Sequence, residues 1–223
     1  MRELCLPIGL AVDEMRQVDT LVADRIRVRK QHTLYRAGEL FRALYAIRVG
    51  SIKTTLLAED GREQVTGFHL QGEILGFDGV GSERHGAGAI ALEDTEVCVL
   101  PFVGIEHLAR AMPVLQHALH QVMSREIARD QSMMLLLSSM RAEERLAVFL
   151  LNLGDRYRRR GYSSTTYELR MARWEIGSFL GLTLETVSRL FTRFQASRLI
   201  HVQGRAVKLL DPVALKQICG QRG

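Results

Sequence analysis

Residues 173–197 read RWEIGSFLGLTLETVSRLFTRFQAS, and this stretch decides the fold of the C-terminal part of the chain. Its apolar spacing predicts a short helix over 173–180 and a second helix from Leu184 to about Ser197. The tight turn Gly181-Leu182-Thr183 separates them, and Thr183 is placed to cap the second helix. Two helices joined in this way form a helix–turn–helix. The predicted inward face of the second helix consists of Leu184, Val187, Leu190, Phe191 and Phe194.

The outward face of the second helix carries residue types that can read DNA bases. Glu185, Ser188 and Arg189 lie at positions i, i+3 and i+4, so they share one face. Arginine can bind guanine O6 and N7 together, a carboxylate accepts from the cytosine amino group, and a hydroxyl serves several bases. Because an exposed glutamate repels phosphate, its presence favours base reading over non-specific binding. The alternative is an ordinary amphipathic helix. The whole outward face consists of Glu185, Thr186, Ser188, Arg189, Thr192 and Arg193.

A predicted hairpin follows the two helices. Apolar stretches at 199–202 and 207–210 flank Gln203-Gly204-Arg205, which predicts a wing with Arg205 at its tip. The charge is uneven along the chain: residues 1–140 hold 15 Lys/Arg and 18 Asp/Glu, whereas residues 141–223 hold 15 and 7. This excess of positive charge in the C-terminal part indicates a polyanionic partner, and double-stranded DNA is the expected one.

The N-terminal part predicts an all-β domain. Short apolar stretches alternate with turn residues at intervals of about 8–12, which is typical of a β-barrel or sandwich. Asp60-Gly61 is a hairpin signal. The predicted strands cover 25–29, 44–48, 51–57, 64–68 and 95–100.

A long helix is predicted over about 114–139, where the chain has no glycine or proline. Part of it shows heptad spacing, which is typical of two helices packed along their length. We therefore expect a homodimer, although the same spacing fits a single amphipathic core helix. The residues of this predicted dimer seam are Met123, Ile127, Asp130, Met134 and Leu137. A second stripe, placed to pack the helix onto the β-domain, consists of Leu115, Leu119, Val122, Met133 and Leu136.

Asp130 is the charged member of the dimer seam. In a symmetric parallel pair it would face its own copy, and two carboxylates brought together repel each other and lose hydration. We expect this to weaken the dimer, so that a signal repositioning the helix controls dimerisation. The alternative is that Asp130 turns to solvent or pairs with Arg129 or another neighbouring cation.

Composition argues against several classes of protein. No apolar run approaches the ~18–20 residues of a membrane helix, and the N-terminus has no apolar signal region. Three scattered cysteines argue against a disulfide scaffold and fit a reducing cytoplasm. The sequence has no phosphate-binding loop, no G-x-S-x-G motif and no catalytic cluster. We therefore expect a cytoplasmic protein that is neither an enzyme nor a membrane protein.

Five segments carry a family resemblance: Leu44-Tyr-Ala-Ile-Arg48, Gly67-Phe-His-Leu70, Gly76-Phe-Asp78, Ala142-Glu-Glu-Arg-Leu-Ala147 and Gly181-Leu-Thr-Leu-Glu-Thr-Val-Ser-Arg189. They resemble the CRP/FNR family of bacterial transcription regulators, and its FNR branch in particular. The resemblance implies an α+β fold. Its parts are a cyclic-nucleotide-binding-like β-barrel (jelly roll) over 1–108, a dimerisation helix over 109–140 and a winged helix–turn–helix over 141–223. It further implies that Glu185, Ser188 and Arg189 read TTGAT-type half-sites, with Thr183 and Arg205 as additional DNA-binding candidates.

The resemblance also implies partners and cofactors. Family members contact RNA polymerase through barrel loops, and the Glu59-Asp60-Gly61 hairpin is the matching candidate. Relatives that bind cyclic AMP use a Gly-Glu pair and an Arg-Ser pair that holds the phosphate. This chain has Gly72-Glu73, but Gly86-Ala87 stands where Arg-Ser is expected. Without that arginine the cyclic phosphate lacks its charge partner, so we do not expect cyclic AMP to bind.

FNR proteins hold a 4Fe–4S cluster on four cysteines. Cys5 and Cys98 resemble two of these ligands, and the other two are absent from the sequence. Since such a cluster takes four thiolates, we expect one only if an N-terminal extension supplies two more cysteines.

The expected function is a homodimeric, sequence-specific transcription regulator, such as an activator, that is governed by oxygen or redox state. One alternative keeps the DNA-binding dimer but replaces the signal by a cyclic nucleotide or another small effector in the barrel. Another is a barrel-based regulatory subunit whose C-terminal domain binds protein. The outward Ser188-Arg189 beside Glu185 favours DNA over this last alternative.

Overall fold

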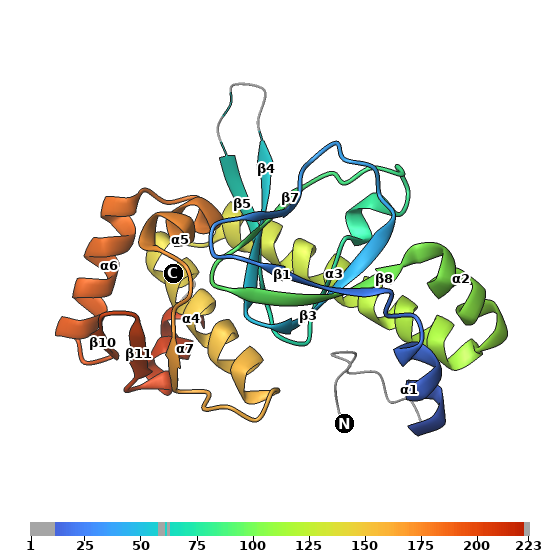
Figure 1. Cartoon of the computed structure of the whole chain (residues 1–223). Coiled ribbons are helices and arrows are strands. Elements are labelled where there is room, and N and C mark those ends of the chain that lie inside the picture. Colours follow the sequence, from blue (N-terminus) through green and yellow to red (C-terminus); the bar gives the residue numbers. More distant parts are fainter. Residues whose placement is uncertain (1–11, 58–60, 62, 221–223) are drawn as a thin grey trace. The chain divides into compact units, whose positions relative to one another are not determined.

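The computed structural model describes residues 12–57, 61 and 63–220. These residues form two compact units, one ending at Arg129 and the other starting at Asp130 (Figure 1). Cys5, Glu59 and Asp60, which the sequence singles out as candidates, lie outside the described residues. Within the described ranges, no helix is both long enough and apolar enough to span a membrane.

In its described residues, the first unit contains two four-stranded antiparallel sheets. One has the order β1 (Asp24–Val28), β8 (Thr95–Pro101), β3 (Ala43–Val49) and β6 (Ile74–Leu75). The other has the order β2 (Thr33–Tyr35), β7 (Gly88–Ala91), β4 (Ser51–Leu57) and β5 (Glu63–Leu70). Neighbours within each sheet are mostly far apart in sequence, as in a jelly roll. The fold class is therefore confirmed, with two separate sheets in place of one closed barrel.

Apolar side chains from both sheets form the core of this unit. Ile47, Ile52 and Val97 belong to one cluster and are completely buried. Gly50, between β3 and β4, has a φ of 95°, and a Cβ there would lie 2.4 Å from Thr95 Oγ1. Only glycine combines this backbone conformation with so close an approach, so Gly50 fixes the reversal that brings β4 back over the core.

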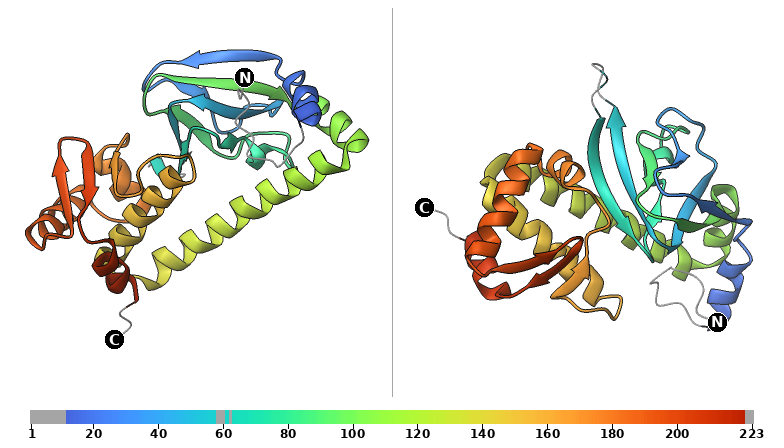
Figure 2. Two further views of the ribbon diagram at one scale, coloured as in Figure 1. Left: turned by 90° about the horizontal axis from the view of Figure 1, so that it is seen from below. Right: turned by 60° about the vertical axis from the view of Figure 1, so that its left-hand side comes forward.

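Helices cover one end of the jelly roll. They are α1 (Val12–Asp19), α2 (Phe102–Ala111) and the start of α3 (Pro113–Ser139), and a short 3₁₀ turn, η1 (Phe77–Gly79), follows β6. The helix predicted over 114–139 is α3, whereas the shorter helices of this unit were not predicted. Figure 2 shows α3 as one uninterrupted helix. Leu115 and Leu119 pack against the apolar clusters of the first unit, as expected for the second stripe.

In the residues that the structure describes, the second unit combines the end of α3 with four further helices and a small sheet. Its helices are α4 (Ala142–Arg158), α5 (Arg173–Leu180), α6 (Leu184–Ala196) and α7 (Pro212–Gly220). Its antiparallel sheet has the order β10 (Ile200–Gln203), β11 (Ala206–Leu209) and β9 (Thr166–Glu168). Figure 1 shows α5 and α6 in sequence, followed by the β10–β11 hairpin. The helix–turn–helix and wing are confirmed, whereas β9 and α7 were not predicted.

Candidate nucleic-acid interface

The turn between α5 and α6 is held by a cap and two glycines. The Thr183 hydroxyl accepts a hydrogen bond from the Thr186 backbone N–H at 3.2 Å, which confirms Thr183 as the N-cap of α6. Gly181 ends α5 in the left-handed conformation, with a φ of 63°. A Cβ on Gly177 would lie 2.7 Å from the Leu182 carbonyl oxygen, so the turn can fold back on α5 only at a glycine. These contacts set the angle at which α6 leaves the turn.

Arg145 of α4 fixes the helix–turn–helix to the rest of the second unit. Its guanidinium donates from Nε to the Met140 carbonyl at 2.9 Å, from Nη1 to that of Leu180 at 3.0 Å, and from Nη2 to that of Leu137 at 2.7 Å. These carbonyls belong to the ends of α3 and α5 and to the linker before α4. This role of Arg145 was not predicted from the sequence. The signal in the sequence was an arginine near the start of a helix, because its planar guanidinium can donate several hydrogen bonds at once.

The inward face of α6 is apolar, with one exception to the prediction. Val187, Leu190, Phe191 and Phe194 are buried, but Leu184 is 46% exposed. Leu184 is the first residue of α6, one turn before Val187. The prediction that its side chain is buried was therefore wrong. The guanidinium carbon of Arg173 lies 3.3 Å from the centre of the Phe191 ring, and burial lowers the pKa of Arg173 to about 10. Arg173 therefore stays charged at neutral pH.

Glu185, Ser188 and Arg189 are all exposed on the opposite face of α6. Hydrogen bonds from its own backbone N–H and from the Thr183 hydroxyl, together with the charge of Arg189, lower the pKa of the Glu185 carboxyl. The carboxylate is therefore ionised at neutral pH and can only accept hydrogen bonds. An Arg189 guanidinium nitrogen lies 3.4 Å from the Thr186 hydroxyl, which is a weak contact. Acceptor, hydroxyl and cationic donor are thus presented side by side.

Two residues of the predicted outward face have structural contacts. Arg193 forms an ion pair with Glu143 of α4, so it fastens α6 to its own unit. The Thr192 hydroxyl donates to the Ser188 carbonyl oxygen at 3.2 Å. Sequence spacing alone could not distinguish these residues from the outward group of Glu185, Ser188 and Arg189.

The wing presents Arg205 at a tight turn. Gln203 pairs with Ala206, so Gly204 and Arg205 form a two-residue loop in which Gly204 has a φ of 60°. Arg205 is exposed, and its carbonyl accepts from the Leu169 backbone N–H at 2.8 Å. The pairing of β10 with β11 and the hydrogen bond from Leu169 therefore hold the loop in place, while the Arg205 guanidinium remains accessible.

The predicted dimer seam is largely open to solvent in the single chain. Met123, Ile127 and Asp130 are exposed, Met134 is 71% exposed, and Leu137 is half-buried. Large apolar side chains repeated along an open helix face are typical of a surface that binds another protein.

Arg129 precedes Asp130 but does not neutralise it. Arg129 donates from Nη2 to the Phe68 carbonyl of β5 at 2.7 Å, and Nη1 lies 3.7 Å from carboxylate oxygens of both Glu73 and Glu126. It thereby ties α3 to the jelly roll. Among the described residues, none forms a salt bridge with Asp130. The structure therefore does not show the alternative in which Asp130 pairs with Arg129.

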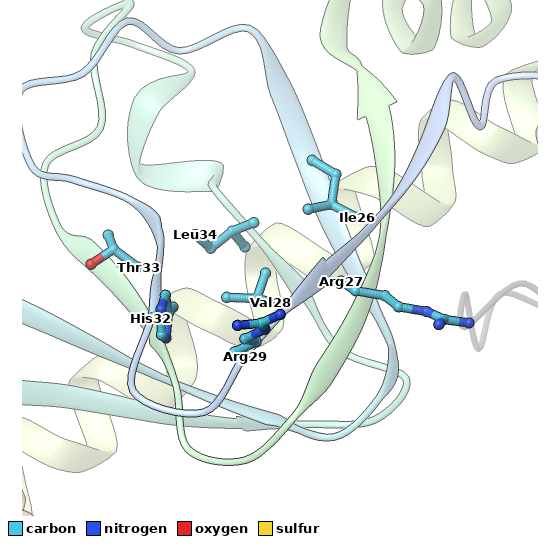
Figure 3. Close-up of a pocket in the computed structure, with 7 residues that line it drawn as sticks. All are labelled: Ile26, Arg27, Val28, Arg29, His32, Thr33 and Leu34. Carbon is cyan, nitrogen blue, oxygen red and sulfur yellow. The ribbon is translucent and has the colours of Figure 1, made fainter.

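In the described part of the jelly roll, the groups at the positions of a cyclic-nucleotide site already have partners within the chain. The Glu73 carboxylate faces Arg129 of α3, and Arg84 donates to the Gly38 carbonyl at 2.7 Å. The backbone N–H groups of Gly86 and Ala87 are already bonded to Asp78. A hollow of about 400 Å³ lies elsewhere, between β1 and the loop to β2 (Figure 3), and is lined by Ile26, Arg27, Val28, Arg29, His32, Thr33 and Leu34. It is an open surface feature, and Arg27 points away from Leu34 (Figure 3).

The described residues do not fit a four-thiolate cluster either. Cys98 of β8 is only 2% exposed and belongs to an apolar cluster against which Leu119 of α3 packs. Burial raises the pKa of its thiol. The Cys219 thiol donates to the Leu215 carbonyl in the second unit. In the described part of the chain, no three His, Cys, Asp or Glu side chains are grouped to hold a metal ion.

Comparison with known proteins identifies both units. Residues 25–111 match the model of the cyclic nucleotide-binding domain, and residues 144–218 match that of the Crp-like helix-turn-helix domain. Among solved structures, FixK2 from Bradyrhizobium japonicum is similar with a TM-score of 0.82 and 30% identity, covering 91% of this chain and 100% of FixK2. The transcriptional regulator TTHB099 from Thermus thermophilus has a TM-score of 0.69 at 25% identity, with coverages of 88% and 97%.

Curated relatives are similar along almost the whole chain. The transcriptional regulatory protein btr of Bordetella pertussis is 48% identical over 218 residues, covering 98% of this chain and 90% of btr. The transcriptional activator protein anr of Pseudomonas aeruginosa is 45% identical, with coverages of 97% and 89%. The fumarate and nitrate reduction regulatory protein of Escherichia coli is 44% identical, with coverages of 98% and 87%. These relatives are regulators and not enzymes, and the chain belongs to the CRP/FNR family of DNA-binding transcription regulators.

Proposed function

We propose that this regulator binds palindromic TTGAT-type sites as a homodimer and reads each half-site with Glu185, Ser188 and Arg189. The observation that carries the proposal is the exposure of these three side chains on one face of a capped helix whose other face is buried. A recognition helix inserted into the major groove needs this division of its two faces.

The chemistry of the three residues suits the single G·C pair in a TTGAT half-site. Guanine presents O6 and N7 acceptors to Arg189, and the paired cytosine presents an amino group to an ionised Glu185. Since the two side chains are one helical turn apart, both bases of one pair are within their combined reach. The hydroxyl of Ser188, between them, can donate to or accept from a neighbouring base. Thr183 at the helix start and Arg205 on the wing are assigned to the DNA backbone, where contacts position the protein without reading sequence.

The dimer is assigned to α3. The exposed apolar side chains of Met123, Ile127 and Met134 support this assignment, because pairing with a second copy removes them from water. Two copies of α6 related by a two-fold axis then match a palindrome. In this arrangement residues 1–108 act as the sensor, 109–140 as the dimerisation segment and 141–223 as the DNA-binding domain.

We assign oxygen or redox state as the signal. The identity to the fumarate and nitrate reduction regulator and to anr supports this assignment. Cys98 is the described residue that we connect to it, since its thiol packs in the cluster that also contacts Leu119 of α3. Because Leu119 packs against this cluster, we expect oxidation of the Cys98 thiol to disturb the packing of the dimerisation helix on the jelly roll. We further propose that the protein acts in the cytoplasm, where the DNA is transcribed, and that Glu59, Asp60 and Gly61 contact RNA polymerase.

A gel-shift titration with a palindromic TTGAT duplex, run with and without oxygen, tests the proposed function. We expect binding to the palindrome to exceed binding to a scrambled duplex by about 10³-fold or more at fixed salt. We also expect oxygen to change the affinity in the wild type and to change it less in a Cys98→Ala variant. Equal affinities for both duplexes contradict the base-reading assignment, and equal affinities with and without oxygen contradict the assigned signal.

A further inference from the structure

The first turn of α6 brings two threonine hydroxyls together. Thr183 is the N-cap and Thr186 follows three positions later, so their side chains are neighbours on the helix surface. Their Oγ1 atoms are 3.1 Å apart, and the Thr186 backbone N–H also donates to Thr183 Oγ1 at 3.2 Å. The cap of the helix therefore also fixes where the Thr186 hydroxyl lies.

Each of these hydroxyls is bonded to one of the proposed base-reading residues. Arg189 donates from Nη2 to Thr186 Oγ1 at 3.4 Å. Hydrogen bonds from its own backbone N–H and from the Thr183 hydroxyl hold the pKa of the Glu185 carboxyl below its ordinary value. The four side chains thus form one continuous chain of hydrogen bonds that runs from Arg189 through Thr186 and Thr183 to Glu185.

The two charged ends fix the direction of every hydrogen bond in this chain. A guanidinium can only donate, an ionised carboxylate can only accept, and a hydroxyl has a single proton to donate. Because Thr183 gives its proton to Glu185, the proton between the two hydroxyls comes from Thr186. The Thr186 oxygen is then free to accept from Arg189. Hydrogen bonds that all point the same way strengthen one another.

We infer that Thr186 is a positioning residue for base reading: its hydroxyl holds the Arg189 guanidinium beside Glu185 before DNA binds. This inference rests on the proposed function, in which Arg189 reads guanine and Glu185 reads the paired cytosine. The contact takes one of the five N–H groups of the guanidinium, so two parallel donors remain for guanine O6 and N7. An arginine that is already oriented loses less conformational freedom on binding, and this favours the base pair that fits it.

The isosteric variant Thr186→Val removes the hydroxyl but keeps the shape of the side chain and the backbone N–H that caps the helix. Its matched control is Thr192→Val, because the Thr192 hydroxyl donates to the Ser188 carbonyl oxygen of the same helix. Affinity is measured for a TTGAT palindrome and for the same palindrome with its G·C pairs replaced by A·T. Since the contact with Arg189 is long, we expect Thr186→Val to lower the preference for the first duplex about threefold in each half-site, hence about tenfold in all. Thr186→Ser, which restores the hydroxyl, and Thr192→Val should stay within about twofold of the wild type.

A double variant with Arg189→Ala distinguishes positioning from a merely structural role. If Thr186 acts through Arg189, Thr186→Val has no further effect on the preference once Arg189 is alanine. Thr186→Ala gives the same comparison should valine not be tolerated. A preference that Thr186→Val leaves unchanged, or lowers equally with and without Arg189, would overturn the inference.

A measurement on the free protein separates this inference from the proposed function. Nitrogen NMR relaxation of the arginine side chains reports how far each Nε–H group is restricted. We expect Arg189 to be more mobile in Thr186→Val than in the wild type, with Arg205 unchanged as the internal reference. Equal mobility of Arg189 in both proteins would overturn the inference even if TTGAT is preferred. A wild type without preference for G·C would contradict the proposed function, and the relaxation comparison would still decide whether Thr186 positions Arg189.

Discussion

Arg189→Ala tests base reading most selectively. Arg189 is exposed, and its contact with the Thr186 hydroxyl is long at 3.4 Å, so its removal changes the free energy of unfolding by less than about 0.5 kcal/mol. Loss of a bidentate guanine contact costs about 1–3 kcal/mol in each half-site, and a dimer on a palindrome loses it twice. The expected total of about 2–6 kcal/mol corresponds to a decrease in affinity of thirtyfold or more.

The assay is fluorescence anisotropy at one salt concentration with three duplexes. They are the TTGAT palindrome, the same palindrome with its G·C pairs replaced by A·T, and a random sequence. For Arg189→Ala we expect the difference in affinity between the first two duplexes to be much smaller than for the wild type, because only the Glu185 contact to this base pair remains, and we expect the random duplex to bind about as it does to the wild type. The control Arg205→Ala, which removes a cation from the wing, should weaken all three similarly. Equal losses on specific and random DNA for Arg189→Ala would refute the assignment of α6 as the reading helix.

The dimer seam, the cysteines and the turn of the helix–turn–helix can each be tested separately. Asp130→Ala removes a charge that we place opposite its own copy, so sedimentation should show a dimer tighter by about 1–3 kcal/mol, and unchanged dissociation excludes Asp130 as the brake. Anaerobic reconstitution of this chain with iron and sulfide should give no 4Fe–4S absorbance, whereas four bound irons that survive Cys219→Ser would contradict that result. Gly177→Ala places a Cβ 2.7 Å from the Leu182 carbonyl, so urea unfolding should show a loss of about 1–3 kcal/mol, and wild-type stability would mean that the turn can shift.

Local signals in the sequence were sufficient for the elements that carry the proposed function. The turn at Gly181 to Thr183 has its own cap and its own positive φ, so it is encoded within a few residues. The long helix 114–139 is likewise visible as an uninterrupted stretch and is α3 in the structure. The wing is encoded by Gly204 at a two-residue loop.

Features that depend on distant contacts were not predictable in this way. Burial of Leu184 could not be judged from helical spacing, because the end of a helix need not be covered. Arg193 resembles a DNA-facing cation in sequence, but its ion pair is with Glu143, 50 positions earlier in the chain. The hydrogen bonds of Asp78 could not be predicted from the sequence, because its two backbone donors lie eight and nine residues away across a loop.

The most direct test of the central claim is the stoichiometry and specificity of wild-type protein on a TTGAT palindrome. Sedimentation of a labelled duplex measures how many chains bind, and competition with a duplex carrying one half-site measures what the second half-site contributes. The account predicts two chains per palindrome and a strong loss of affinity when one half-site is removed. One chain per palindrome, or equal affinity for one and two half-sites, would contradict a dimer that reads DNA through paired copies of Glu185, Ser188 and Arg189.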